Sequence, residues 1–299
     1  MKRYLNILVL SIFATSVLSA ENPSAQGIEM DDLLNLNYKP RIEKYMIYGG
    51  FGLSTMLYET NVGKRQNGLG GHFGVGYSVG LSKKAPNLRF VTGIEAALYN
   101  TTYTATTLKT SSMATDFAGD EFEFRNTLNE YKEKKRAIFL QIPLMLKYRF
   151  DYNPKQGYYI MGGGKVAFPI SGKYTNSATS IKNAGYYAHS NSLFDSQRFM
   201  GFGLFDNLKA EGDLKFKPSF LLSLEAGTKL NLYFLNLDIG VFMDYGLISV
   251  RPDSEKLFVQ YRTTSTGGDF SVNSMLSENA QLIDKMKPFA VGIKLRLGF

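Results

Sequence analysis

Ionisable residues stand at alternate positions within several otherwise apolar segments of this chain. In residues 289–299, for example, Lys294 and Arg296 alternate with Ile293, Leu295 and Leu297. Acids and bases brought together from such segments would either neutralise one another in a buried ion network or line a narrow path for ions. The candidate residues for this network are Glu95, Lys165, Glu225, Lys229, Asp238, Asp244, Lys294 and Arg296.

Other chemistry has little support in the sequence. The chain has two histidines, His72 and His189, and no cysteine, so neither a histidine-rich nor a thiolate metal site is expected. His189 lies close to Ser190 and Ser192, but a catalytic Ser-His pair is recognised by its geometry and not by adjacency. We therefore predict a protein that is not an enzyme and carries no cofactor. A rim-located enzyme acting on lipid or peptide remains the third alternative.

The elements that position these charges are predicted to be β-strands. In residues 71–81, Phe73, Val75, Tyr77 and Val79 alternate with glycine and serine, which is the period-two pattern of a strand. The same pattern predicts eight strands, at about residues 44–58, 71–81, 88–99, 136–150, 157–170, 220–229, 235–245 and 289–299. Pro143 falls inside the fourth of these strands, where a β-bulge would accommodate it.

The connections between the predicted strands alternate in length. Those after the second, fourth and sixth strands are short, and the others are longer. This asymmetry is typical of outer-membrane barrels, and closure with an even strand number leaves no unpaired edge. We predict an all-β fold, an eight-stranded antiparallel transmembrane β-barrel over residues 44–299 with short periplasmic turns and long extracellular loops. Side chains just fill a barrel of this size, which favours an ion network that plugs the lumen.

The N-terminus predicts export. Lys2 and Arg3 precede a short apolar core, and small residues follow as far as Ala20, which is the pattern of a cleaved signal peptide at residues 1–20. An uncleaved membrane helix would need about 20 apolar residues. The predicted location is the outer membrane of a Gram-negative bacterium. Residues 21–43 would form a periplasmic segment, either a disordered tether or a contact for a partner.

The charge of the chain bears on its partners. The net charge is +8, and loss of Lys2 and Arg3 with the signal peptide leaves +6. Export makes nucleic acid an unlikely partner for this excess, whereas outer-membrane lipid is an expected one. A soluble β-sandwich or a lipocalin-like barrel, with its apolar face inward and the charges in water, is the alternative that composition alone allows.

Two connections have a distinct composition. Residues 116–133 are rich in acids and are predicted to form a loop that ends in bases. The basic residues either contact lipid phosphates at the level of the headgroups or form the solvated end of the loop. They are Lys132, Lys134, Lys135 and Arg136. The connection between the fifth and sixth strands is rich in aromatic residues, which are expected either to bind a partner or to pack together as a cap. They are Tyr174, Tyr186, Tyr187, Phe194, Phe199, Phe202 and Phe205.

Several segments resemble one family of membrane proteins. Residues 140–148 read LQIPLMLKY and are similar to the L-x-I-P-L-x-x-K-Y strand of the outer-membrane β-barrel domain family that includes PorT-like proteins. Residues 245–247 (YGL) and the closing strand also resemble that family. The resemblance implies an eight-stranded outer-membrane barrel. Residues 289–299 also resemble the closing strand of bacterial outer-membrane β-barrels in general, which implies that Phe299 is a signal for the barrel-insertion machinery.

PorT-like members of that family are associated with a protein secretion apparatus. The predicted function is accordingly a non-enzymatic interaction or structural role, as a candidate component of an envelope or secretion assembly. An envelope protein would bind through the long loops or through residues 21–43. A small-solute transport pore is the second alternative.

Overall fold

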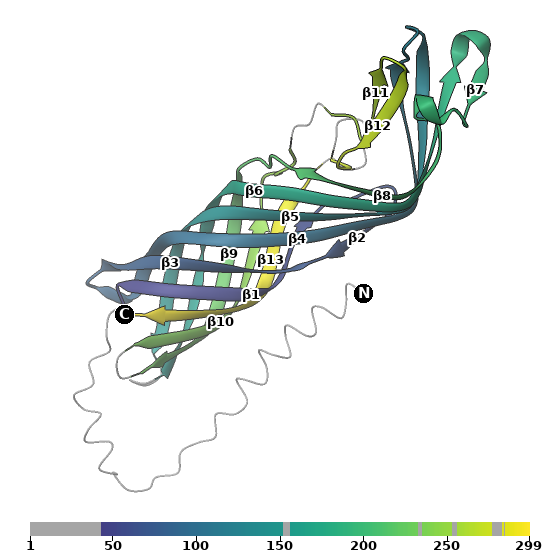
Figure 1. The fold of residues 1–299 in the computed structure, drawn as a ribbon. Helices are drawn as coiled ribbons and strands as arrows, with labels where there is room; N and C mark the ends of the chain where they lie inside the picture. The colour runs from purple at the N-terminus through teal and green to yellow at the C-terminus, as the bar shows by residue number, and fades with distance from the viewer. Residues whose placement is uncertain (1–42, 152–155, 233–234, 253–255, 277–282, 284) are drawn as a thin grey trace, which may run out of the picture. The chain divides into compact units, whose positions relative to one another are not determined.

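The computed structural model describes residues 43–151, 156–232, 235–252, 256–276, 283 and 285–299 (Figure 1). The predicted signal peptide at 1–20 lies outside this part of the chain, as does all of the segment 21–43 except Glu43. Within the described part, no helix has the length and apolar character needed to span a membrane.

The described part of the chain is all-β, as predicted, with only two single turns of 3-10 helix, η1 (Ala188–Ser190) and η2 (Arg198–Met200). Its strands are β1 (Tyr45–Leu57), β2 (Lys64–Asn67), β3 (Leu69–Ser82), β4 (Ala85–Thr115), β5 (Glu121–Asp151), β6 (Gln156–Tyr187), β7 (Ser192–Phe194), β8 (Gly203–Asp213), β9 (Ser219–Asn231), β10 (Asn236–Gly246), β11 (Val259–Thr264), β12 (Gly267–Val272) and β13 (Lys287–Gly298).

Eight of these strands form a closed antiparallel ring. The order around it is β4-β3-β1-β13-β10-β9-β6-β5, and the β4–β5 pairing closes the circle. The eight predicted strands correspond to these eight. At the C-terminus the amide of Phe299 donates to the carbonyl of Tyr45, and the amide of Lys44 donates to the carbonyl of Phe299. The chain end is thereby tied to the beginning of the first ring strand.

Three strands are much longer than predicted. The strands β4, β5 and β6 have 31, 31 and 32 residues and continue beyond the ring as an extension of the sheet (Figure 1). In this extension β7 and β8 pair with β6, and β2 pairs with β4. The prediction of a loop at 116–133 was therefore wrong, because only 116–120 turn and β5 begins at Glu121. In the extension, apolar residues of β5 such as Phe122, Phe124 and Leu128 form the buried face. In the ring, the apolar residues of the same strand form the exposed face.

Pro143 is accommodated without the bulge that the sequence predicted. The β5–β6 register is continuous through Pro143, and its only shift lies at Ile138 and Phe139. On the other side, the β4–β5 pairing is interrupted between Thr92 and Glu95 without a change of register. Proline lacks the N–H that a ladder needs, so a local gap on one side is sufficient and no extra residue is required.

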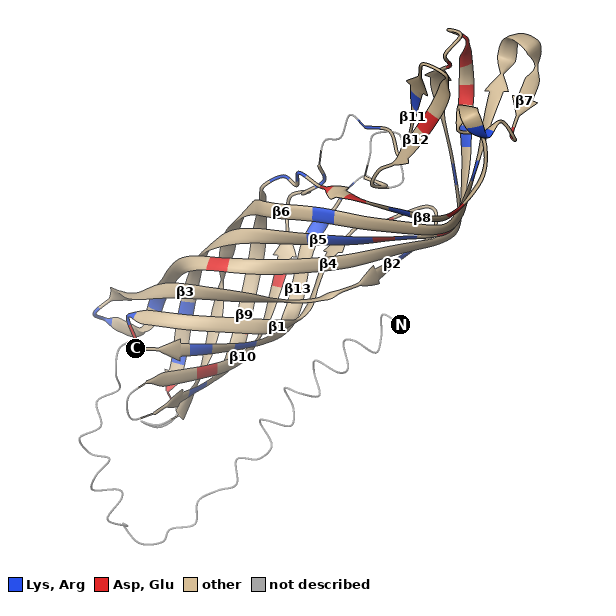
Figure 2. Cartoon of the chain, viewed as in Figure 1, with Lys and Arg blue, Asp and Glu red and all other residues tan. Residues whose placement is uncertain are grey.

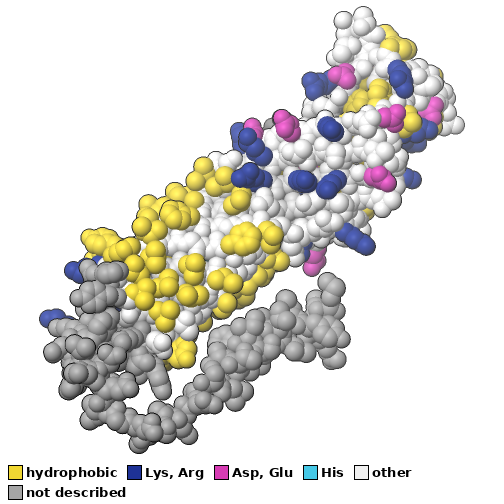
Figure 3. All heavy atoms as spheres, turned by 60° about the horizontal axis from the view of Figure 1, so that its bottom comes forward, with side chains coloured by type: hydrophobic (Ala, Val, Ile, Leu, Met, Phe, Trp, Pro, Cys, Tyr) yellow, Lys and Arg dark blue, Asp and Glu magenta, His cyan; other side chains and the backbone are white. Residues whose placement is uncertain are grey.

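The two faces of the ring differ sharply in polarity. On β5, Ile142, Leu144, Leu146, Tyr148 and Phe150 are 36–50% exposed, whereas the intervening side chains are buried. Figure 3 shows that hydrophobic side chains gather in a band over the ring, with charged residues beyond it toward the extension. The soluble alternative required the apolar face to point inward, and the structure has the opposite orientation.

Glycine residues let neighbouring strands of the ring approach each other closely at three places. Three glycine pairs face each other directly across neighbouring strands, at Gly52–Gly292, Gly76–Gly93 and Gly227–Gly240. A Cβ atom on Gly227 would lie 2.2 Å from the carbonyl oxygen of Ile239, so this close approach of backbones requires glycine. The ring can therefore curve tightly and still leave room for long charged side chains at other positions.

The end of the interior nearest the extension is filled by the connection between β10 and β13. Phe258, Met275, Leu276 and Met286 from this connection are buried in one cluster with aromatic residues of the ring strands, including Tyr103. The connection also carries the β11–β12 hairpin, which forms a separate two-stranded sheet. Apolar packing thus closes this end of the ring. The rest of the interior contains buried charged residues beside a second, smaller apolar cluster, and Figure 2 shows that Lys, Arg, Asp and Glu occur on the strands of the ring.

Candidate functional site

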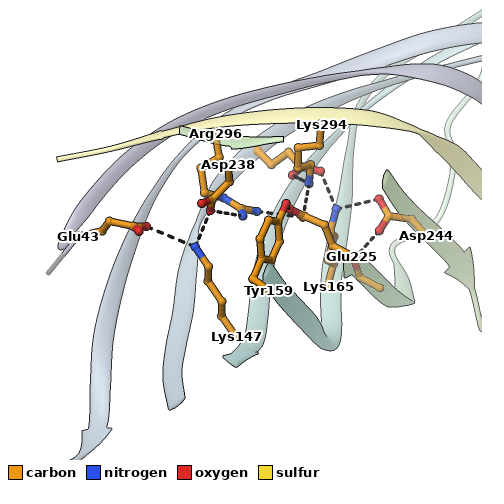
Figure 4. Close-up of polar contacts among 11 residues, drawn as sticks. Glu43, Lys147, Tyr159, Lys165, Glu225, Asp238, Asp244, Lys294 and Arg296 are labelled. Carbon is orange, nitrogen blue, oxygen red and sulfur yellow. Dashed lines mark hydrogen bonds and ion pairs between the residues drawn. The ribbon is translucent and has the colours of Figure 1, made fainter. Parts of the chain in front are cut away.

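All eight residues of the predicted ion network are buried in the ring, and each takes part in at least one ion pair. They project from five strands, β4, β6, β9, β10 and β13, into its interior, and Figure 4 shows the polar contacts among most of them. The residues are Glu95, Lys165, Glu225, Lys229, Asp238, Asp244, Lys294 and Arg296.

Lys165 of β6 is the centre of the first group. Its ammonium lies 2.9 Å from Glu95 on β4 and 2.8 Å from Asp244 on β10. The hydroxyl of Ser223 donates a further hydrogen bond of 2.5 Å to Asp244. Charge-assisted hydrogen bonds of this length are the stronger kind, so one cation joins strands that are far apart around the ring.

Glu225 of β9 is the centre of the second group. Its carboxylate lies 2.9 Å from Arg296 and 3.6 Å from Lys294, both on β13, and it accepts a hydrogen bond of 2.7 Å from the hydroxyl of Tyr159. Lys294 also lies 3.4 Å from Glu95. Lys294 therefore connects this group to the one around Lys165.

A third group lies toward the short turns of the ring. Lys147 is 2.5 Å from Asp238 and 3.3 Å from Glu43, while Lys229 is 2.7 Å from Glu43 and Arg296 is 3.4 Å from Asp238. Lys147 is not among the eight candidates, but alternation with Met145 and Leu146 predicts its inward position on the fourth strand. Glu43 is a member that the sequence reasoning missed, because it lies before β1, where no strand pattern could place it.

This arrangement binds acidic and basic side chains to one another. The described residues contain no group of His, Cys, Asp and Glu that could hold a metal ion. His72 is buried in the ring, edge-on to Phe242 at 4.5 Å between ring centroids, whereas His189 lies in η1, beyond the end of β6. The structure does not bring the two histidines together, and no hydrogen bond among the described residues links either one to serine or aspartate.

The basic residues at 132–136 are divided between the two faces of β5. Lys132, Lys134 and Arg136 are exposed, but Lys135 is buried. The prediction of one outward cluster of four bases was therefore wrong for Lys135, because consecutive residues of a strand point to opposite faces. Lys135 instead pairs with Glu133, two residues away, at 2.9 Å.

Glu133 of β5 binds the β10–β13 connection to that strand. It accepts hydrogen bonds from the hydroxyls of Tyr131 (2.5 Å) and Ser274 (2.6 Å) and from the amide of Met275 (2.9 Å). Together with the ion pair to Lys135, these contacts satisfy a carboxylate that is fully buried. A buried and fully bonded group of this kind holds the connection in one position.

Several of the aromatic residues predicted between the fifth and sixth ring strands pack against aromatic residues of β5 and of the β11–β12 hairpin. Tyr187 stacks on Phe122 at 5.1 Å, and Phe202 lies 5.4 Å from the same ring, edge to face. Phe194 and Phe199, by contrast, are 39% and 61% exposed. The extension therefore has an aromatic core, which fits the predicted cap, and leaves two aromatic side chains in contact with solvent.

The chain matches no model of a known protein family, and a search of curated proteins finds no relative. The resemblance to PorT-like proteins therefore stays a prediction.

Replacing Lys165 by methionine tests whether the ion network stabilises the ring. Lys165→Met leaves Asp244 without its ion pair and Glu95 with only the more distant Lys294. Breaking a buried pair typically costs about 3–5 kcal/mol, and we expect a loss of this size in the free energy of unfolding. Urea titration of the refolded protein in detergent micelles measures it, with Lys134→Met on the exposed face as control. Equal stability of the two variants would contradict a stabilising network.

The turn that joins β4 to β5 depends on the charge of Asp116. Its carboxylate accepts hydrogen bonds from the amides of Ala118 (2.8 Å) and Asp120 (3.0 Å) and from the hydroxyl of Tyr187 (2.8 Å). Burial raises the pKa of the Asp116 carboxyl, but these hydrogen bonds outweigh it and hold the pKa below its usual range. A lowered pKa stabilises the fold above the unfolded value of about 3.9, and the effect is lost as the pH falls through the folded value.

At neutral pH, Asp116→Asn should accelerate amide hydrogen exchange at the turn about tenfold, because hydrogen bonds to a charged acceptor are worth ~1.5–3 kcal/mol. The difference from the wild type should shrink as the pH falls below about 4. Asp120→Asn, in the same turn but exposed, is the matched control. A difference that stays constant between pH 7 and pH 3 would show that the charge of Asp116 is not responsible.

Proposed function

We propose that this protein is an integral outer-membrane protein with a non-enzymatic, interaction or structural role. In this proposal the ring of eight strands is a transmembrane β-barrel, its short turns face the periplasm, and the extension of β4, β5 and β6 lies outside the cell. The observation that carries the proposal is the apolar exterior of a ring whose interior is charged.

Exposed apolar side chains occur on every strand of the ring, for example Ile47, Val75, Ile94, Leu144, Ile160, Leu222, Val241 and Ile293. A continuous apolar surface of this extent is rare on monomeric proteins in water, whereas the hydrocarbon core of a bilayer would cover it. A closed ring also satisfies its backbone hydrogen bonds internally, which a bilayer demands of any spanning structure. These two properties support membrane insertion, and the predicted signal peptide agrees with export.

The contents of the ring argue against the alternative of a transport pore. The ion network occupies the centre, and the β10–β13 connection, fastened at Glu133, fills the end toward the extension. A barrel filled in this way is suited to present surfaces to partners. Phe194 and Phe199 on the extension are exposed and are candidate contacts for an envelope protein, and Phe299 is the proposed signal for barrel insertion.

A charge on the outer face should prevent insertion. Val75 is 51% exposed on β3, within the apolar band, and an arginine near the bilayer midplane costs about 2–4 kcal/mol. We expect Val75→Arg to lower the yield of folded, heat-modifiable protein in the membrane fraction, whereas His189→Arg in the extension should not.

Recovery of the wild-type protein in the soluble fraction, or equal insertion of the two variants, would contradict the proposal. Steady single-channel currents from the wild type in planar bilayers would favour a pore instead of a closed barrel.

A further inference from the structure

The ion network of the ring contains more cations than carboxylates. Seven buried cations face five buried carboxylates, an excess of two positive charges. The cations are Arg89, Lys147, Arg149, Lys165, Lys229, Lys294 and Arg296, and the carboxylates are Glu43, Glu95, Glu225, Asp238 and Asp244. Arg89 and Arg149 are the two that form no ion pair with a carboxylate of the described residues, and both lie at the short-turn end of the ring.

Arg89 is bonded only to neutral acceptors. Its guanidinium donates to the hydroxyl (2.6 Å) and the carbonyl (2.8 Å) of Ser78 and to the backbone carbonyl of Glu43 (2.6 Å). It stands directly opposite Lys147 in the β4–β5 register. Like charges in directly opposite positions destabilise a pair of strands, so this arrangement favours a further anion nearby.

Arg149 lacks even neutral partners for part of its guanidinium. The side chain is only 6% exposed, and its Nε is buried without a hydrogen-bond acceptor. It is two residues from Lys147 on the same inward face of β5. Glu43, a carboxylate at the same end of the ring, is already shared between Lys147 at 3.3 Å and Lys229 at 2.7 Å. A buried charge without a partner is unfavourable.

We propose that Arg149, with Arg89 and Lys147 beside it, forms a binding site for an oxyanion at the short-turn mouth of the ring. A guanidinium presents its donors in a planar fork that matches a phosphate or a carboxylate. A bound oxyanion would neutralise the positive charge that exceeds the charge of the buried carboxylates in the ring. The oxyanion that we propose as the ligand is a phosphate from solution.

Calorimetric titration of the refolded, full mature chain with inorganic phosphate tests the site, with chloride added to keep the ionic strength constant. We expect binding of one phosphate per chain, weakened about tenfold or more by Arg149→Gln because the fork of donors is lost. Arg149→Lys keeps the charge without the fork and should weaken binding to an intermediate extent. Lys134→Gln removes an exposed cation of the same strand and should leave binding unchanged.

The proposal is overturned if the wild type binds no phosphate, or if Arg149→Gln binds it as the wild type does. Should Arg149→Gln fail to fold, unchanged affinity in Arg149→Lys overturns the proposal equally.

Discussion

Buried charges need partners, and the pairing of charges inside the ring is the constraint on which the rest of this structure depends. Lys165 on β6 pairs with Glu95 on β4 and Asp244 on β10, and Glu225 on β9 pairs with Arg296 on β13. One strand lies between the partners in each of these pairs. The Lys165–Glu95 pair spans β5, whose pairing with β4 closes the ring, so the network is complete only when the ring is closed. A slip of one residue would turn each side chain to the other face, so the network also specifies the register.

The long strands change their surroundings along their length. In the ring, β5 turns Leu144 and Leu146 outward and Lys147 inward. In the extension, the same strand buries Phe122 and Phe124 and exposes Arg125. Between the two regions, Glu130 has a positive φ of 51°, and the buried positions change from even to odd numbers. One continuous strand therefore exposes its apolar residues in the ring and buries its apolar residues in the extension.

This change explains which parts of the fold could be predicted from the sequence. Strict alternation with apolar residues on one face identified all eight ring strands and the inward position of residues such as Glu95 and Lys294. The extension was missed because its polarity is reversed and its period is interrupted at Glu130, so that acids such as Glu121 and Glu123 were interpreted as a loop. Glu43 could not be placed because its position depends on cations of β5 and β9, which are distant in sequence. Export, membrane location and the family resemblance stay predictions.

The most direct test of the account is to measure whether single tryptophans on the two faces of the ring contact lipid. The chain contains no tryptophan of its own, so each introduced residue is the only fluorescent tryptophan. Tryptophan would replace Leu144 or Phe220 on the exposed face, and Phe139 on the buried face, in protein reconstituted into vesicles. The account predicts that lipids with brominated acyl chains quench the fluorescence of the first two and leave that of the third nearly unchanged. Strong quenching at Phe139 with none at Leu144 and Phe220 would contradict a barrel that turns its apolar face to lipid and its charges to the interior.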